Sequence, residues 1–142
     1  MSLIESVKAY IAKYAGLETG APLWVDYLGD QPTGYAIIPL PGTKVAEQYL
    51  DGGSLREFPF AFQSMELTAD EQERIDNIGF YEAFSDWIEE QDLRRDYPVL
   101  VEGKTPLRIE ALGWAFVYET SESETAVYRI QCKLTYEQDP IS

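Results

Sequence analysis

Residues 49–66, YLDGGSLREFPFAFQSME, decide the fold of this chain. The run Asp51-Gly52-Gly53 supplies the backbone freedom that a tight turn between two strands requires. Three phenylalanines follow at alternate positions: Phe58, Phe60 and Phe62. Because alternate side chains of a strand share one face, the stretch predicts a hairpin between strands over 45–50 and 55–66, with one aromatic face.

Pro59 lies inside the second of these strands. Proline has no backbone N–H to donate to a neighbouring strand, so it predicts an edge strand or a bulge at this point. Two shorter strands are expected upstream, over 24–28 and 35–40, where proline and glycine bound apolar runs.

Two helical regions flank these strands. In residues 2–15 apolar side chains recur at helical spacing, Ser2 and Glu5 fit a capping box, and Gly16 fits the stop. The second region covers about 69–93, and its apolar face predicts a helix that packs on a sheet, with Trp87 buried against that sheet. That face comprises Phe80, Tyr81, Phe84, Trp87 and Ile88.

Start and break signals are also present in the second helical region. Thr68 and Glu71 have the spacing of a capping box, which predicts the helix start. Asn77 and Gly79 are expected to divide the region into two helices.

The clearest alternation lies in residues 126–136, which predict a strand paired with a second strand over 107–118. The chain is therefore expected to be a single domain, residues 1–142, of the α+β class. The expected architecture is a mostly antiparallel sheet with a long C-terminal hairpin and two main helical regions packed on one face.

The net charge is −14, which argues against specific nucleic-acid binding and against docking on anionic membranes. Residues 66–96 hold 11 acidic residues and 3 arginines, so the charge is concentrated there. No apolar run of about 18 residues and no secretory leader is visible, and the single cysteine fits a reducing cytoplasm.

Candidate catalytic groups are scarce in this sequence. The chain has no histidine, and Cys132 lies on the apolar face of a predicted strand, where a packed, inert thiol is expected. Paired carboxylates such as Glu89 and Glu90 are expected to be solvated, and no calcium-loop spacing occurs. The sequence thus predicts no enzyme, no catalytic, metal or cofactor residues, and no cofactor.

Several stretches, taken in order, resemble the minor capsid proteins of siphophages of Gram-positive bacteria and of related prophages. They are Val25-Asp26-Tyr27-Leu28-Gly29, Asp51-Gly52-Gly53-Ser54 with the Phe-rich strand, Asn77-x-Gly79-Phe80-Tyr81-Glu82, Phe84-x-Asp86-Trp87-Ile88-Glu89, and Tyr128-x-Ile130-Gln131-Cys132-x-Leu134-x-Tyr136. The set spans nearly the whole chain.

The resemblance implies a structural virion protein of the tail-terminator or head–tail joining type, present in the host cytoplasm during assembly. Such proteins self-associate into rings, often sixfold, that meet the tail-tube and head–tail connector proteins. The candidate contacts to a subunit or partner are Asp51, Gly52, Gly53 and Ser54. In a ring, acidic side chains would repel DNA from the channel, and the candidates are Glu82, Asp86, Glu89, Glu90, Glu122 and Glu124.

Two other functions stay open on the sequence alone. The first is a cytosolic small-ligand or partner-binding module with an aromatic pocket. The second is a carboxylate enzyme of the glycosidase type, which would need two buried carboxylates about 5–9 Å apart across a cleft.

Overall fold

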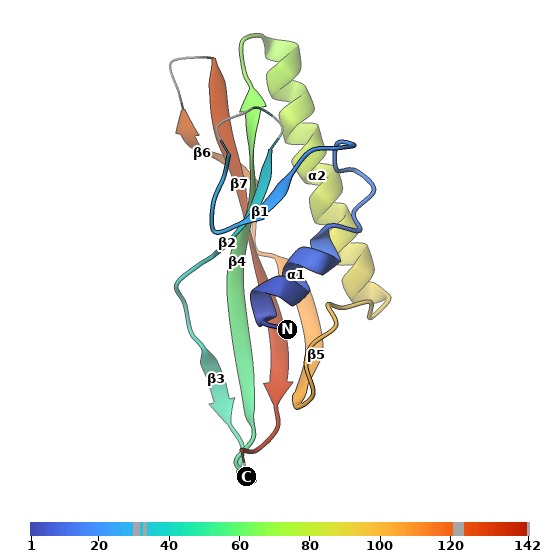
Figure 1. Ribbon diagram of the computed structural model, residues 1–142, viewed down its shortest axis with the longest axis vertical. Coiled ribbons are helices and arrows are strands. Elements are labelled where there is room, and N and C mark those ends of the chain that lie inside the picture. The colour runs from blue at the N-terminus through green and yellow to red at the C-terminus, as the bar shows by residue number, and fades with distance from the viewer. Residues whose placement is uncertain (30–31, 33, 121–123, 142) are drawn as a thin grey trace.

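The computed structural model describes residues 1–29, 32, 34–120 and 124–141. Figure 1 shows helices α1 (Leu3–Ile11) and α2 (Glu71–Leu93) beside a long sheet. The strands are β1 (Leu23–Val25), β2 (Tyr35–Pro39), β3 (Val45–Gln48), β4 (Ser54–Leu67), β5 (Lys104–Ala111), β6 (Phe116–Thr120) and β7 (Thr125–Gln138). The expected α+β class is confirmed, with a mostly antiparallel sheet, a C-terminal hairpin and helices packed on the sheet.

The two longest strands, β4 and β7, form the centre of the sheet. They pair antiparallel along their whole length, from Ser54 opposite Gln138 to Leu67 opposite Thr125. Strands β2 and β3 pair with the outer side of β4, and β5 and β6 pair with the outer side of β7. Strand β1 pairs parallel with β2. The sheet therefore has β1 and β3 at one edge and β5 and β6 at the other.

Pro59 lies in the central strand β4, so the expected edge strand or bulge at this proline is wrong. Its carbonyl oxygen accepts a hydrogen bond from the backbone N–H of Leu40 at 3.0 Å, just beyond the end of β2. The nitrogen and the carbonyl oxygen of a strand residue point to the same side, so the ring nitrogen lies at the interval between β2 and β3. Because the missing N–H falls in that interval, pairing with β7 continues through Pro59 without a register shift.

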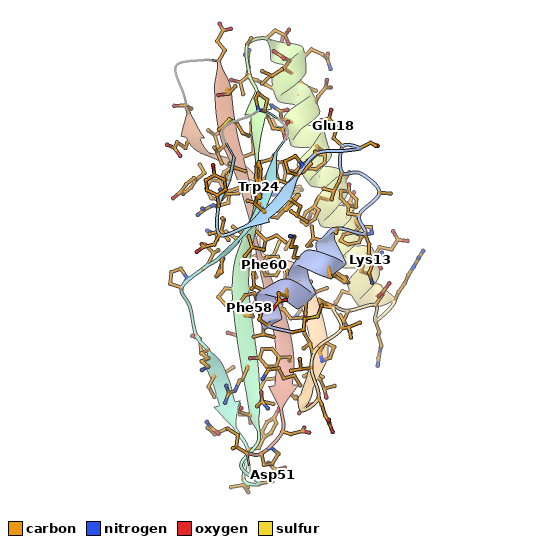
Figure 2. The ribbon with its side chains drawn as sticks, viewed as in Figure 1. Lys13, Glu18, Trp24, Asp51, Phe58 and Phe60 are labelled. Carbon is orange, nitrogen blue, oxygen red and sulfur yellow. The ribbon has the colours of Figure 1, made fainter. Side chains whose placement is uncertain are left out.

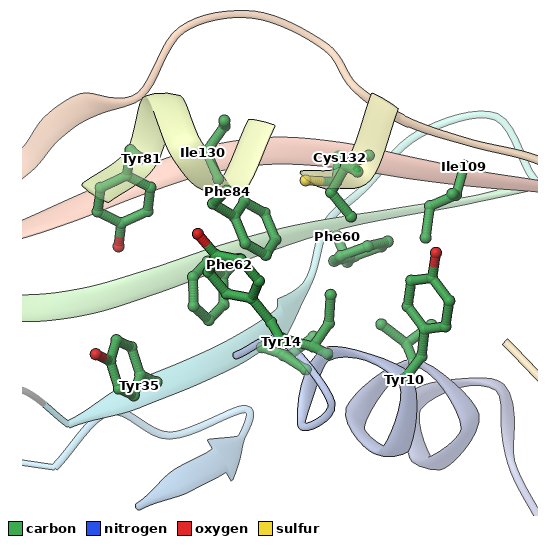
Figure 3. Packing of buried hydrophobic residues seen from close by; sticks show 14 of the residues in the cluster. Tyr10, Tyr14, Tyr35, Phe60, Phe62, Tyr81, Phe84, Ile109, Ile130 and Cys132 are labelled. Atoms are coloured by element: carbon green, nitrogen blue, oxygen red, sulfur yellow. The ribbon is translucent and has the colours of Figure 1, made fainter. Parts of the chain in front are cut away.

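The core lies between the helices and the sheet. Phe60 and Phe62 are fully buried, and Phe58 packs half-buried beside them, which confirms the alternation expected for this strand. Phe62 stacks on Phe84 of α2 with ring centroids 4.4 Å apart. Figure 3 shows Tyr14 of the α1 end reaching the same cluster. One core therefore joins both helices to the sheet.

Trp87 occupies a different position from the one expected. It is half-buried and packs on Tyr10 and Tyr14, with ring centroids 5.3 and 5.0 Å apart. The aromatic face of α2 is wide enough to cover both the sheet and α1, and Trp87 lies on the α1 side. Tyr81, Phe84 and Ile88 supply the buried contacts of α2.

The second helical region is one continuous helix, so the division expected at Asn77 and Gly79 is wrong. The side chain of Asn77 donates to the carbonyl oxygen of Leu67 at 2.9 Å and ties α2 to the end of β4. Gly79 remains helical in open space. A polar tertiary contact thus explains the asparagine better than a helix break.

Helix boundaries differ from the expected ones at two points. The capping box of α1 at Ser2 and Glu5 is confirmed, but the helix ends at Ile11 and not at Ala15. At α2 the capping box is shifted by two residues, because Asp70 accepts from the backbone N–H of Glu73 at 2.8 Å. The competing signal of Thr68 and Glu71 is not used there.

The single strand expected over 107–118 is two strands. Leu112 still donates its N–H to the carbonyl oxygen of Gln131 at 2.8 Å, but the chain then leaves the ladder until β6 begins at Phe116. We call residues 112–115 the β5–β6 link. This interruption divides the edge of the sheet that β5 and β6 form.

Candidate interaction surfaces

The 49–54 turn lies at one end of the long axis, where Figure 2 labels Asp51. The N–H of Tyr49 donates to Gly53 at 2.8 Å, and the N–H of Gly52 donates back to Tyr49 at 3.1 Å. Gly52 has φ +94°, a conformation that favours glycine. The sequence therefore forms the tight hairpin turn that the glycines predict.

Only part of the turn is available to a partner. Asp51 and Gly52 are exposed, whereas Gly53 and Ser54 are buried. The Asp51 carboxylate accepts from the N–H of Gly53 at 2.8 Å, and the Ser54 hydroxyl accepts from Nε of Arg56 at 2.9 Å. Leu50, which sequence reasoning did not single out, is fully exposed at the tip. The exposed part of the turn is thus Leu50, Asp51 and Gly52.

The acidic candidates divide into two groups. Glu82, Asp86, Glu89 and Glu90 are all exposed on α2, on the side away from its buried face, and Glu90 forms an ion pair with Arg94. Glu124 is exposed before β7, at the opposite end of the sheet from the 49–54 turn. Glu122 lies outside the described residues. The two groups occupy separate elements, and both present charge to solvent.

The β5–β6 edge carries apolar side chains in solvent. They are Leu107, Leu112, Trp114, Phe116, Val117 and Tyr118. Trp114 is 79% exposed, which is unusual for the largest apolar side chain. Sequence reasoning placed these residues in a paired strand, although the apolar run 112–118 lacks the clean alternation of 126–136.

The two strands of this edge differ in their protection. In β5 the outward N–H of Ile109 donates to the carboxylate of Asp92 at 3.0 Å, and that carboxylate also accepts from the hydroxyl of Tyr97 at 3.1 Å. In β6 all five residues are exposed. Within the described part of the chain, no strand pairs with the outer side of β6. Strand β6 is therefore an open edge, whereas β5 is partly capped.

A cavity of about 220 Å³ opens beside this edge, between α2 and β7. We call it the α2–β7 cavity. Six of its lining residues are Ile78, Tyr81, Trp114, Ala115, Tyr128 and Ile130. Figure 3 shows Tyr81 of α2 beside Ile130 of β7. Glu82 contributes the charged group of the lining.

A buried polar contact fixes one wall of the cavity. The hydroxyl of Tyr81 lies 2.7 Å from the hydroxyl of Ser64 and donates to the carbonyl oxygen of Tyr128 at 3.2 Å. Burial raises the pKa of Tyr81 well above its usual value, so the phenol stays neutral. Tyr81 therefore offers its ring to the cavity while its hydroxyl is used inside the protein.

Cys132 is fully buried in the core. Burial raises the pKa of its thiol, so the reactive thiolate is disfavoured. The inert, packed thiol expected from the strand pattern agrees with this placement.

Glu66 is a partly buried carboxylate whose surroundings give a pH dependence. Burial raises its pKa, the hydroxyl of Ser64 opposes the rise, and the charge of Glu18 adds to it. The folded protein then binds more protons than the unfolded chain from about pH 4.5 up to the raised pKa. Protonated Glu66 therefore contributes to the stability of the fold below about pH 4.5, and this contribution is lost as the pH rises through the raised pKa.

We therefore expect Glu66→Gln to gain stability relative to the unmodified protein as the pH rises from 4 to 7. The neutral amide occupies the same partly buried site without the desolvation of a charge. Urea unfolding at several pH values measures the difference. Glu47→Gln on β3 is the control for the loss of one negative charge. A difference in unfolding free energy between Glu66→Gln and the unmodified protein that stays constant from pH 4 to 7 would contradict the raised pKa of Glu66.

No group of three or more His, Cys, Asp or Glu side chains is placed to hold a metal ion in the part of the chain that is described. Within the same residues, no helix has both the length and the apolar character needed to cross a membrane.

In comparisons with known proteins, no family model matches this chain, and no curated protein is significantly similar to it.

Proposed function

We propose that this chain is a structural protein of a phage or prophage particle that acts in head–tail joining or tail completion. In this role it assembles into a ring and docks on the tail-tube and connector proteins. The observation that supports the proposal most is the open β6 edge with its exposed apolar side chains. Monomeric proteins usually charge, cover or shorten such edges, so an uncovered one indicates a partner.

The sequence resemblance supports the same function from a different side. Its ordered motifs fall on the end of β1 and the four residues after it, the 49–54 turn, β4, α2 and β7. These elements form the sheet, the core and the acidic helix face. The resemblance therefore concerns the framework of the molecule and does not depend on one loop.

Recruitment to tail tubes tests the proposal directly. We expect the labelled protein to bind one end of purified tail tubes, because a terminator meets the tube only where growth stops. Electron microscopy with a gold label measures the position. Phe116→Asp on β6 is expected to abolish end binding, whereas Ile75→Asp, an exposed apolar residue of α2, is the matched control. Labelling along the whole tube, or none, counts against the proposal.

The acidic face gives a second test of the ring. If Glu82, Asp86, Glu89 and Glu90 line the channel, reversing their charge to lysine creates phosphate contacts that slow DNA passage. A separate double variant reverses Glu122 and Glu124. DNA ejection from assembled particles is timed at low and physiological salt, and slow ejection at low salt is expected for the group that faces the channel. Normal kinetics in both variants would leave these charges with a solubilising role only.

The α2–β7 cavity favours a second candidate function, a small-ligand or partner-binding module. Its aromatic and aliphatic lining is of the kind that receives apolar ligands. A strictly monomeric protein that binds an apolar small molecule and ignores tail tubes would favour this candidate over the first.

A further inference from the structure

The α2–β7 cavity is suited to one bulky apolar side chain. An apolar cavity of about 150 Å³ accommodates benzene, and this one has about 220 Å³. Ile78 and Trp114 flank the opening and are 55% and 79% exposed. Tryptophan is enriched among the residues that dominate binding energies, since it buries a large surface in a well-fitting contact.

The open β6 strand begins directly after the cavity. Trp114 and Ala115 line the cavity, and β6 starts at the next residue, Phe116. Half of the backbone groups of an edge strand point outward and can pair with an added strand. A single extended segment can therefore pair with β6 and place an anchoring side chain in the cavity.

The acidic residues around the cavity favour a partner segment with a positive charge. Glu82 lines the cavity itself, and the neighbouring surface between α2 and β5 adds Glu89 and Asp92. The cation in this lining, Arg108, lies 3.4 Å from Glu110 and is already paired. A partner segment that carries lysine or arginine is attracted to this surface, whereas the β6 strand of a second copy, which carries Glu119 and no basic residue, is not.

We infer that the α2–β7 cavity and the β6 edge form one docking site for an extended, basic segment of a partner protein. The segment inserts one bulky apolar side chain, such as phenylalanine or leucine, between Ile78 and Trp114. Its basic side chains face Glu82 and, farther along α2, Glu89 and Asp92. That the partner is a virion protein rests on the proposed function; the site and its chemistry do not.

A model peptide tests the site on the isolated full-length protein. The probe is acetyl-Lys-Thr-Lys-Phe-Lys-Thr-Lys-amide, titrated while amide, indole and methyl signals are followed by NMR. We expect saturable shifts at the Trp114 indole, the methyl groups of Ile78 and Ile130, and the amides of β6. The same peptide with glycine in place of phenylalanine, or with glutamate in place of every lysine, should bind at least about tenfold more weakly.

Variants then separate the site from the overall charge. Trp114→Ala and Glu82→Lys are expected to weaken binding about tenfold or more, since they remove the apolar wall and reverse the local charge. Ile75→Ala and Asp86→Lys change exposed residues of the same helix outside the cavity lining and should leave binding within about twofold of the unmodified protein. Unchanged amide spectra away from the cavity verify the fold of each variant.

Three results would overturn the inference. The first is equal binding of the glycine peptide, and the second is a set of shifts spread over the outer face of α2, since both mean charge attraction alone. The third is concentration-dependent self-association through β6, which makes a second copy the occupant. Peptide binding without recruitment to tail tubes would instead refute the proposed function and leave the docking site intact.

Discussion

Replacement of Phe84 by alanine is expected to lower the free energy of unfolding by about 3–5 kcal/mol. Phe84 is fully buried, stacks on Phe62 at 4.4 Å and contacts Tyr14 edge-on at 5.5 Å. Its loss removes transfer energy and leaves a cavity at the point where both helices and the sheet meet. Chemical denaturation followed by circular dichroism measures the change.

Phe84→Leu is the matched control, because it keeps most of the apolar volume and should cost much less than the alanine variant. A loss below about 1 kcal/mol for Phe84→Ala would mean that α2 does not pack on β4 as described.

Replacement of Ile11 by alanine is expected to cost about 2–5 kcal/mol. Ile11 is fully buried in the last turn of α1, and its neighbour Tyr10 donates its hydroxyl to the carbonyl oxygen of Asp96 at 2.7 Å. Since α1 is short, tertiary packing and not intrinsic propensity holds it in place. Urea unfolding of the variant measures the loss.

Lys8→Ala provides the comparison on the same helix, because Lys8 is exposed and its removal should stay within about 0.5 kcal/mol. Equal effects of the two substitutions would show that α1 contributes little to the core.

Strands β4 and β7 were predictable where bulky apolar side chains recur at alternate positions. In β4 and β7 the pleat forces alternation, so Phe60, Phe62 and Ile130 indicate both the strand and its inner face. The helix face of Tyr81, Phe84 and Ile88 was predictable for the same reason at helical spacing.

Predictions from single residues were wrong where tertiary contacts determine the local structure. Pro59 indicated an edge strand because it has no N–H to donate. The prediction failed because the sequence does not reveal that β2 and β3 leave an interval beside the central strand β4. Asn77 indicated a helix break, but its amide bonds to the end of β4. Trp87 shares the apolar face of α2, and only the position of α1 determines which neighbour it contacts.

The candidate surfaces were predictable in part. The glycines of the 49–54 turn and the carboxylates of α2 follow from composition and spacing alone. The β6 edge and the α2–β7 cavity do not, since both arise where the chain leaves the ladder after Leu112. A run of apolar residues over 112–118 without alternation is the signal that could have indicated them.

The pairing of β4 with β7 also governs when the chain can fold. Ser54 lies opposite Gln138 and Leu67 opposite Thr125, so the central ladder joins residues from distant parts of the sequence. Closing such long loops is costly, and topologies dominated by distant contacts fold slowly. During synthesis one edge of β4 stays unpaired until the ribosome has completed β7 at residue 138. Nascent chains shorter than this carry an unpaired edge of β4, which is prone to aggregation until the last strand has emerged.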